Sequence, residues 1–265
     1  MKIIMEKINF KKKYGQNFLS DTNLLKAIVS DSLITPEDEV LEIGAGAGAL
    51  TYELAKNCKK LISFEIDKSL ENILKEKLKE FNNVNLIFSD ILKIKTQEID
   101  NFFEKKYKIV ANLPYYITSP IIFKFLEESK KVDSLTIMVQ KEVGEKMLAI
   151  PKSQNYGVLS VMVNHYANVK ITRIVKRHMF TPPPKVDSCI VKLDIKHVPF
   201  DKGFKNFVQT AFSMRRKTLL NNLSKLYKKE QIEKVLLSFN INLNVRAEEL
   251  QLEDFEKLYI TFRQN

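Results

Sequence analysis

The sequence predicts an α/β domain with a parallel sheet and helices on both of its faces, followed by a small all-helical domain. Short apolar runs alternate with amphipathic runs along most of the chain, as in strand–helix–strand units. A glycine-rich turn joins the first strand-like run to a helix. After about His197 the strand-like runs stop, and apolar residues recur only at helical spacing. We therefore place one domain at residues 1–197 and a second at residues 198–265.

The expected elements follow in chain order. A first helix begins near Asp21 or Thr22, either of which can cap it. Strands are then expected at 39–43, 61–66, 84–88, 108–111 and 135–140. Helices are expected at 49–57, 68–81, 120–128 and 142–150, with Ser119 as the N-cap before Pro120. Two later strand-like runs, 169–175 and 189–195, can form an antiparallel hairpin that closes the sheet. In the second domain, four helices are expected, because apolar residues recur at helical spacing from Phe204, Leu220, Ile232 and Phe255 onward.

Composition narrows the class of protein. The net charge of +11 favours a polyanionic partner, RNA or DNA, although lysines that merely solvate the surface are the alternative. No apolar run approaches the roughly 20 residues that span a bilayer. The first residues start apolar and turn basic, the reverse of a signal peptide, so we expect a cytoplasmic protein without a membrane partner. Neither Cys58 nor Cys189 has a CxxC partner, and the histidines lack metal-ligand spacing, so no metal is expected.

The segment Glu42–Gly48 follows the first strand and opens a helix, which is typical of nucleotide binding. Small residues such as Gly44 and Gly46 let the backbone approach a ligand, and a helix N-terminus offers free N–H groups. Glu65 ends the next strand, about 20 residues after Gly44, where a carboxylate can accept both ribose hydroxyls. Asp90 ends the third strand and can accept from an adenine amine. These residues alone fit either S-adenosylmethionine or a nicotinamide cofactor.

The tetrapeptide Asn112-Leu113-Pro114-Tyr115 follows the fourth strand and favours methylation of an amine. The lone pair of adenine N6 is delocalised into the ring, so this nitrogen is a poor nucleophile. Two acceptors near its N–H groups, the Asn112 side-chain oxygen and the Leu113 carbonyl, would localise the lone pair. Pro114 stiffens the turn, and Tyr115 offers a face on which an extruded base can stack. A sulfonium donor is already activated, so no strong general base is needed.

In these motifs the chain resembles the KsgA (RsmA) type of ribosomal RNA small-subunit adenine dimethyltransferase, over nearly its whole length. Besides the segments above, the resemblance is carried by Tyr14–Leu19, Phe180–Ser188 and Phe212–Lys217. It implies a Rossmann-like class I methyltransferase sheet with a helical domain. It also implies dimethylation of two adjacent adenosines near the 3′ end of 16S rRNA, within a small ribosomal subunit or its precursor. S-adenosylmethionine is the implied methyl donor, and we expect a monomer.

By the same resemblance, Asn17 and Leu19 join Gly44, Gly46, Glu65, Asp90 and Asn112 in the cofactor site. Tyr116 departs from the asparagine expected in bacterial members, but the acceptor pair is intact. The related Erm type, which methylates 23S rRNA, shares the glycine-rich loop and an Asn-x-Pro-Tyr motif. Leu113 and Phe212–Lys217 favour the KsgA type, so the choice of rRNA rests on fewer residues than the reaction does.

Two basic clusters are candidate RNA contacts. Arg215, Arg216 and Lys217 lie between two expected helices. Arginine guanidinium groups bind phosphate well, which favours a contact with RNA. Alternatively, these cations only stabilise the end of a helix by facing its dipole. Lys11, Lys12 and Lys13 are either a second contact or a solvated tail.

Three other functions fit the sequence less well than rRNA methylation. A nicotinamide-dependent dehydrogenase would need a hydride-transfer acid or base, and the chain shows no convincing one. A non-catalytic ribosome assembly factor would have no need for paired acceptors at N6. DNA adenine methylation fits less well, because that motif often begins with Asp.

Overall fold

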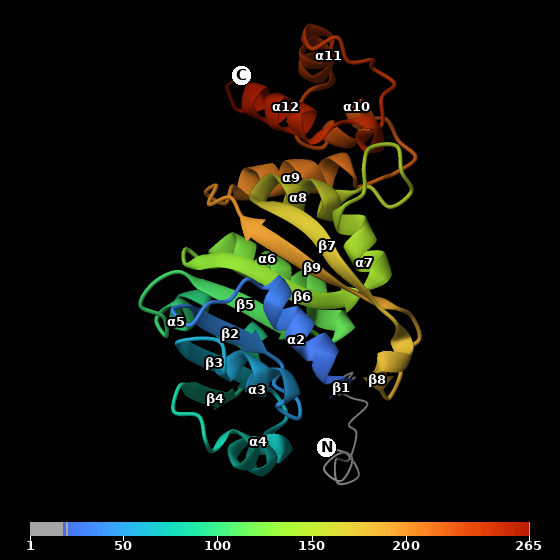
Figure 1. Cartoon of the computed structure of the whole chain (residues 1–265). Coiled ribbons are helices and arrows are strands. Elements are labelled where there is room, and N and C mark those ends of the chain that lie inside the picture. The colour runs from blue at the N-terminus through green and yellow to red at the C-terminus, as the bar shows by residue number, and fades with distance from the viewer. Residues whose placement is uncertain (1–17, 20, 265) are drawn as a thin grey trace. The chain divides into compact units, whose positions relative to one another are not determined.

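The computed structural model describes residues 18–19 and 21–264, and its contacts divide them into two compact units (Figure 1). One unit comprises the described residues up to Gly144 together with Lys170–Ile195. The other comprises Glu145–Val169 and the described residues from Lys196 onward. The segment 145–169, which the sequence-based boundary at residue 197 assigned to the first domain, thus groups by contacts with the C-terminal helices.

A seven-stranded mixed sheet is the framework of the first unit, in the order β4-β3-β2-β5-β6-β9-β7. Its strands are β2 (Glu39–Ile43), β3 (Lys60–Glu65), β4 (Val84–Phe88), β5 (Tyr107–Asn112), β6 (Val132–Gln140), β7 (Ala167–Val175) and β9 (Ser188–Ile195). Strands β4 to β6 of this order pair in parallel, whereas β9 pairs with β6 in antiparallel fashion. The two runs expected as a hairpin are indeed neighbours in the sheet. A separate antiparallel pair joins β1 (Phe18–Leu19) to β8 (Phe180–Thr181).

The described helices of this unit are α2 (Thr22–Asp31), α3 (Ala49–Ala55), α4 (Glu71–Leu78), α5 (Thr96–Asp100), α6 (Thr118–Glu128) and α7 (Lys141–Met147), the last of which crosses the unit boundary. Helices α3 to α6 lie between successive parallel strands, α2 precedes β2 and α7 follows β6. Asp21 caps α2 through a 2.9 Å hydrogen bond from the Leu24 backbone N–H. The α/β fold class predicted from the sequence is therefore confirmed.

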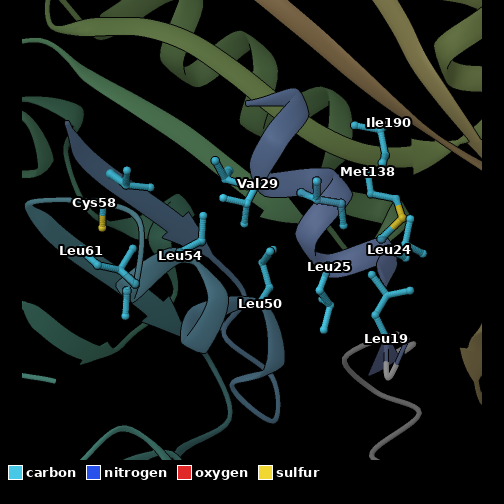
Figure 2. Close-up of a cluster of buried hydrophobic side chains, with 14 of the residues drawn as sticks. Leu19, Leu24, Leu25, Val29, Leu50, Leu54, Cys58, Leu61, Met138 and Ile190 are labelled. Atoms are coloured by element: carbon cyan, nitrogen blue, oxygen red, sulfur yellow. The ribbon is translucent and has the colours of Figure 1, made fainter. Parts of the chain in front are cut away.

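The main core of this unit lies between α2, α3 and one face of the sheet. Figure 2 shows Leu25 and Val29 of α2 and Leu50 and Leu54 of α3 in one apolar cluster. Strand residues such as Leu61, Met138 and Ile190, together with Cys58, complete it (Figure 2). The opposite face is also covered, because the strand residues that point there, Leu41, Ile62, Ile109 and Ile137, are at most 1 % exposed.

The second unit is helical apart from the start of β7. It contains α8 (Val158–Tyr166), α9 (Lys202–Ala211), α10 (Leu219–Leu223), α11 (Lys229–Ser238) and α12 (Leu252–Gln264). Asp201 caps α9 by accepting from the Gly203 and Phe204 backbone N–H groups. The same carboxylate accepts from Tyr259 and Arg263 of α12, so one side chain links two helices. No described helix is both long and apolar enough to cross a membrane.

Two sequence expectations about helices were wrong. Helix α6 begins at Thr118 with Ile117 at the N-cap position, so Ser119 lies inside its first turn. Helix α6 starts earlier than expected because a 3₁₀ segment, Tyr115–Ile117, leads directly into it. Helix α8 was not predicted at all. Its valine-rich sequence weakens a helical pattern, and buried residues occur on most of its surface.

Candidate active site

The candidate active site is a cavity of about 160 Å³ at the carboxyl ends of β2, β3, β4 and β5. Because parallel strands end at the same edge of a sheet, the residues after each strand meet there. Strand β2 supplies Gly44 and Gly46, β3 supplies Glu65, β4 is followed by Asp90, and β5 supplies Asn112–Tyr115. The cavity is lined by Ile43, Gly44, Gly46, Phe64, Glu65, Ile66, Ser89, Asp90, Ile91, Leu92, Asn112, Leu113, Pro114, Tyr115, Tyr116 and Ile117.

The glycine-rich loop after β2 requires its glycines. Gly44, Gly46 and Gly48 all have positive φ, at 84°, 55° and 72°. The Gly44 backbone N–H donates to Phe64 O at 2.8 Å, which ties the loop to the end of β3. A Cβ at Gly44 would stand 3.7 Å from the Asn112 backbone oxygen. The absence of a side chain therefore keeps the space between the loop and the end of β5 open to a ligand.

Glu65 is buried at the end of β3, only 5 % exposed. Its two carboxylate oxygens accept from the Gly46 N–H at 2.7 Å and from the Asp67 N–H at 2.8 Å. Burial raises the pKa of Glu65, and these backbone donors oppose the shift. Each oxygen has a second lone pair, so the carboxylate can still accept from a ligand hydroxyl in the cavity.

Asp90 holds the turn after β4 and faces the same cavity. Its Oδ1 accepts from the Leu92 backbone N–H at 3.1 Å, which caps a short 3₁₀ turn. The apolar side chains of Ile66, Ile91 and Leu92 line the cavity beside it. A flat heterocycle with an exocyclic amine matches this combination of an acceptor and apolar walls.

The tetrapeptide Asn112–Tyr115 closes the cavity at the end of β5. Leu113 is buried at 2 % exposure, whereas Asn112, Pro114 and Tyr115 are partly exposed. Burial raises the pKa of the Tyr115 phenol, so it stays protonated at neutral pH. Its oxygen lies 2.8 Å from Ser188 Oγ. Tyr116, the residue that departs from the family pattern, is 61 % exposed at the cavity mouth.

A third acidic residue, Glu42, precedes the glycine-rich loop and is fully buried. Its Oε2 accepts from Ser63 Oγ, while Oε1 has no hydrogen-bond partner among the described residues. Burial raises the pKa of Glu42 to about 7. The nearby Lys77 ammonium reaches the loop itself, donating to Ala47 O at 3.0 Å. This carboxyl does not line the cavity, so we treat it as support for the loop.

The structure brings together most of the site residues predicted from the sequence, but not Leu19. Gly44, Gly46, Glu65, Asp90 and Asn112–Tyr115 all line one cavity. Leu19 instead packs in the apolar cluster beside α2 and does not line it (Figure 2). Asn17 and the lysines Lys11, Lys12 and Lys13 lie outside the described residues. Sequence reasoning missed the apolar lining, for which the only signal was its position directly after each strand.

The predicted RNA-binding residues lie between α9 and α10, as expected. Arg215, Arg216 and Lys217 are all exposed. Arg215 is already engaged, since its Nε donates to Glu248 Oε2 at 2.6 Å. The Arg215 guanidinium is therefore less available for a new contact than the exposed side chains of Arg216 and Lys217. Among the described residues, no group of three or more His, Cys, Asp or Glu side chains could hold a metal ion.

Comparisons with known proteins agree on the family. A family model described as ribosomal RNA adenine dimethylase matches residues 7–264. The chain is 43% identical over 263 residues to the ribosomal RNA small subunit methyltransferase A of Clostridium acetobutylicum, covering 96% of this chain and 95% of that protein. A dimethyladenosine transferase structure from Plasmodium falciparum is 32% identical with a TM-score of 0.82, over 93% of this chain and 98% of that one.

The 23S rRNA methyltransferase ErmE is a more distant match, at 26% identity and a TM-score of 0.72, over 94% of this chain and all of that one. The resemblance inferred from the sequence motifs is thus confirmed. A family model that spans nearly the whole chain, and a cavity at the strand ends with an Asn-Leu-Pro-Tyr turn, lead to one conclusion: this chain belongs to the ribosomal RNA adenine dimethylase family.

Proposed function

We propose that this chain uses S-adenosylmethionine to dimethylate N6 of two adjacent adenosines near the 3′ end of 16S rRNA. The observation that carries the proposal is that Asn112–Tyr115 lines the same cavity as Gly44, Glu65 and Asp90. A group that activates an amine thus lies beside groups that suit a nucleoside. The 43% identity to a protein named as a small-subunit methyltransferase supports 16S rRNA as the target.

The residues present fit S-adenosylmethionine. Glu65 is placed to accept the ribose hydroxyls and Asp90 the adenine amine, with Ile66, Ile91 and Leu92 against the base. The open space that a Cβ at Gly44 would narrow leaves room for the rest of the molecule beside Asn112. When bound, this cofactor supplies a methyl group on a positively charged sulfur. No metal enters this proposal.

The chain's own residues then activate and orient the amine. The Asn112 side-chain oxygen and the Leu113 carbonyl accept from the two N6 hydrogens, which favours a pyramidal nitrogen with a localised lone pair. The Tyr115 ring stacks on the extruded base and holds the nitrogen in line with the methyl group. The nitrogen would bond to the methyl carbon as the carbon–sulfur bond breaks, which would leave the sulfur as a neutral thioether, and would then release a proton to solvent. A second round on the same nitrogen gives the dimethylated product.

The proposed partner is a small ribosomal subunit or its precursor, contacted by a monomer in the cytoplasm. The net charge of +11 and the exposed Arg216 and Lys217 support binding to an RNA backbone. The family supports ribosomal RNA as the polyanion in preference to DNA.

Labelled methyl donor and small subunits from cells that lack this methylation test the proposal directly. The expected result is label in N6,N6-dimethyladenine at two adjacent positions of 16S rRNA, located by mass mapping. An absence of label at adenine N6 would contradict the proposal. Label only in 23S rRNA would replace it with the Erm-type function, which the match to ErmE makes the second candidate.

Two variants separate chemistry from cofactor binding. Asn112→Ala should abolish transfer while leaving much of the affinity for S-adenosylmethionine. Glu65→Ala should mainly weaken that affinity. Asn101→Ala is a matched control, because Asn101 is exposed at the end of α5 and does not line the cavity. Equal loss of transfer in Asn112→Ala and Asn101→Ala would show that the tetrapeptide has no special role.

A further inference from the structure

The hydroxyl groups of Tyr115 and Ser188 form a hydrogen bond of 2.8 Å, in which either oxygen can be the donor. The two residues are 73 positions apart in the sequence. Tyr115 belongs to the 3₁₀ turn after β5 and lines the cavity, whereas Ser188 is the first residue of β9. They meet because β9 runs antiparallel to β6, so β9 begins at the edge where the parallel strands end.

Ser188 is a fixed point in this pair. It is fully buried, and its backbone is paired with Gln140 at the end of β6. The residue before it is also held, since Asp187 O accepts from the Lys141 N–H at 3.0 Å. The Asp187 carboxylate accepts from the Arg177 N–H and from Lys176 Nζ, each at 3.0 Å. The Ser188 hydroxyl therefore has little freedom to move.

Tyr115 needs such a fixed point. None of the residues in its 3₁₀ turn is buried, and the adjacent Tyr116 is 61 % exposed. The Tyr115 ring is only partly enclosed by packing, so a hydrogen bond can contribute to its orientation. A hydrogen bond at the far end of the ring restricts rotation about both side-chain torsions. Because burial raises the pKa of the phenol, its proton remains available for this bond at neutral pH.

We propose that Ser188 is a positioning residue, which fixes the Tyr115 ring through this hydrogen bond so that the ring can stack on the target adenine. This inference rests on the proposed function, because it assumes that Tyr115 meets the base. Ser188 does not line the cavity and touches no reacting atom. Its effect should therefore appear in the rate of methyl transfer and not in cofactor affinity.

The test is a double-mutant cycle of Ser188→Ala and Tyr115→Phe in the full chain. Single-turnover methyl transfer to undermethylated small subunits gives the rate, and calorimetry gives the affinity for S-adenosylmethionine. Each single variant should slow methyl transfer about tenfold. This loss of rate is larger than the loss of one weak hydrogen bond causes and smaller than the loss caused by a misplaced reactant. The double variant should be no slower than either single one. Cofactor affinity should stay within about twofold of wild type, because neither hydroxyl has been assigned to cofactor recognition.

Ser134→Ala is the matched control, because Ser134 is a buried serine of the neighbouring strand β6 and lies outside the cavity. Its transfer rate should equal that of wild type. If Ser188→Ala does not fold, the transfer rate of Tyr115→Phe relative to wild type still tests the hydrogen bond. Tyr115 is partly exposed, so this variant should fold. A wild-type rate in either single variant, or additive losses in the double variant, would overturn the inference. A wild-type protein without N6 transfer would instead overturn the proposed function, and this inference with it.

Discussion

The carboxylate of Glu65 accepts a hydrogen bond of 2.7 Å from the backbone N–H of Gly46, which joins the end of β3 to the loop after β2. The other carboxylate oxygen accepts from the Asp67 N–H at 2.8 Å. One side chain therefore shapes the loop and also lines the cavity. The conformation of the loop and the recognition of a ligand depend on the same two oxygens.

Glu65→Gln should reduce the affinity for S-adenosylmethionine by about fivefold or more. The amide has only one acceptor oxygen, so either Gly46 or Asp67 loses its partner, at a cost of about 1–3 kcal/mol. Isothermal titration calorimetry measures the change. Glu53→Gln is the control, because Glu53 is a buried carboxylate of α3 that does not line the cavity. Similar losses in both variants would contradict a specific role for Glu65.

Gly48→Ala should destabilise the protein by about 1–3 kcal/mol, since an alanine there must adopt a left-handed backbone conformation. Gly48 has φ 72°, and an added Cβ would lie 2.8 Å from Leu74 Cδ2 of α4. Thermal and denaturant unfolding measure the loss. Gly157→Ala is the control, because Gly157 has φ 179° and nothing lies within 4 Å of its added Cβ. Equal stability of the two variants would refute the expectation.

Glu42→Gln should change how stability depends on pH. Folding raises the pKa of Glu42 from 4.5 to about 7, so the native state binds this proton more tightly than the unfolded state does. The contribution of Glu42 to the free energy of unfolding therefore falls as pH rises from about 4.5 to about 7. The neutral glutamine lacks this loss.

The stability of Glu42→Gln relative to wild type should accordingly increase between pH 5 and pH 8, by roughly 3 kcal/mol at most. Urea unfolding of both proteins across this range is the measurement, and the difference between them cancels the other titrating groups. A difference that stays constant with pH would show that Glu42 is ionised throughout.

Arg216→Ala combined with Lys217→Ala should weaken RNA binding and flatten its dependence on salt. Each lost phosphate contact lowers the slope of log K against log salt by about 0.7–0.9. Filter binding to a 16S rRNA fragment at several salt concentrations gives this slope. Lys75→Ala with Lys79→Ala removes the same charge from the exposed surface of α4 and is the control. An unchanged slope in the Arg216 and Lys217 variant would remove both from the RNA surface.

The sequence was sufficient to predict the parts of the fold that follow local rules. The strands that precede Gly44, Asp90 and Asn112 are short and apolar. The residues that follow each strand could be assigned a role in ligand binding or methyl transfer from their chemistry. Long-range relationships were less accessible. The insertion of β9 between β6 and β7 depends on which strand edge is free, and no local pattern encodes this choice.

The candidate site shows the same division. Gly44 and Glu65 could be assigned to one site from their spacing, because strand–turn–helix geometry brings such positions together. Ser188 belonged to a segment that the family resemblance had marked, but nothing in its spacing connected it to Tyr115. Their contact arises only from the antiparallel direction of β9. The Leu19 side chain packs in the core, and the assignment of this residue to the cofactor site by resemblance stays a prediction.

Both cysteines of the chain are buried, and this has a practical consequence for spectroscopy. Cys189 is fully enclosed, and burial raises the pKa of Cys58 to about 12. Because the thiolate is the reactive form, neither native sulfur should compete for a maleimide dye at neutral pH. A single cysteine introduced at an exposed position such as Asn101 would then carry the only label. Fluorescence could follow the protein on and off ribosomal particles without removing a native residue.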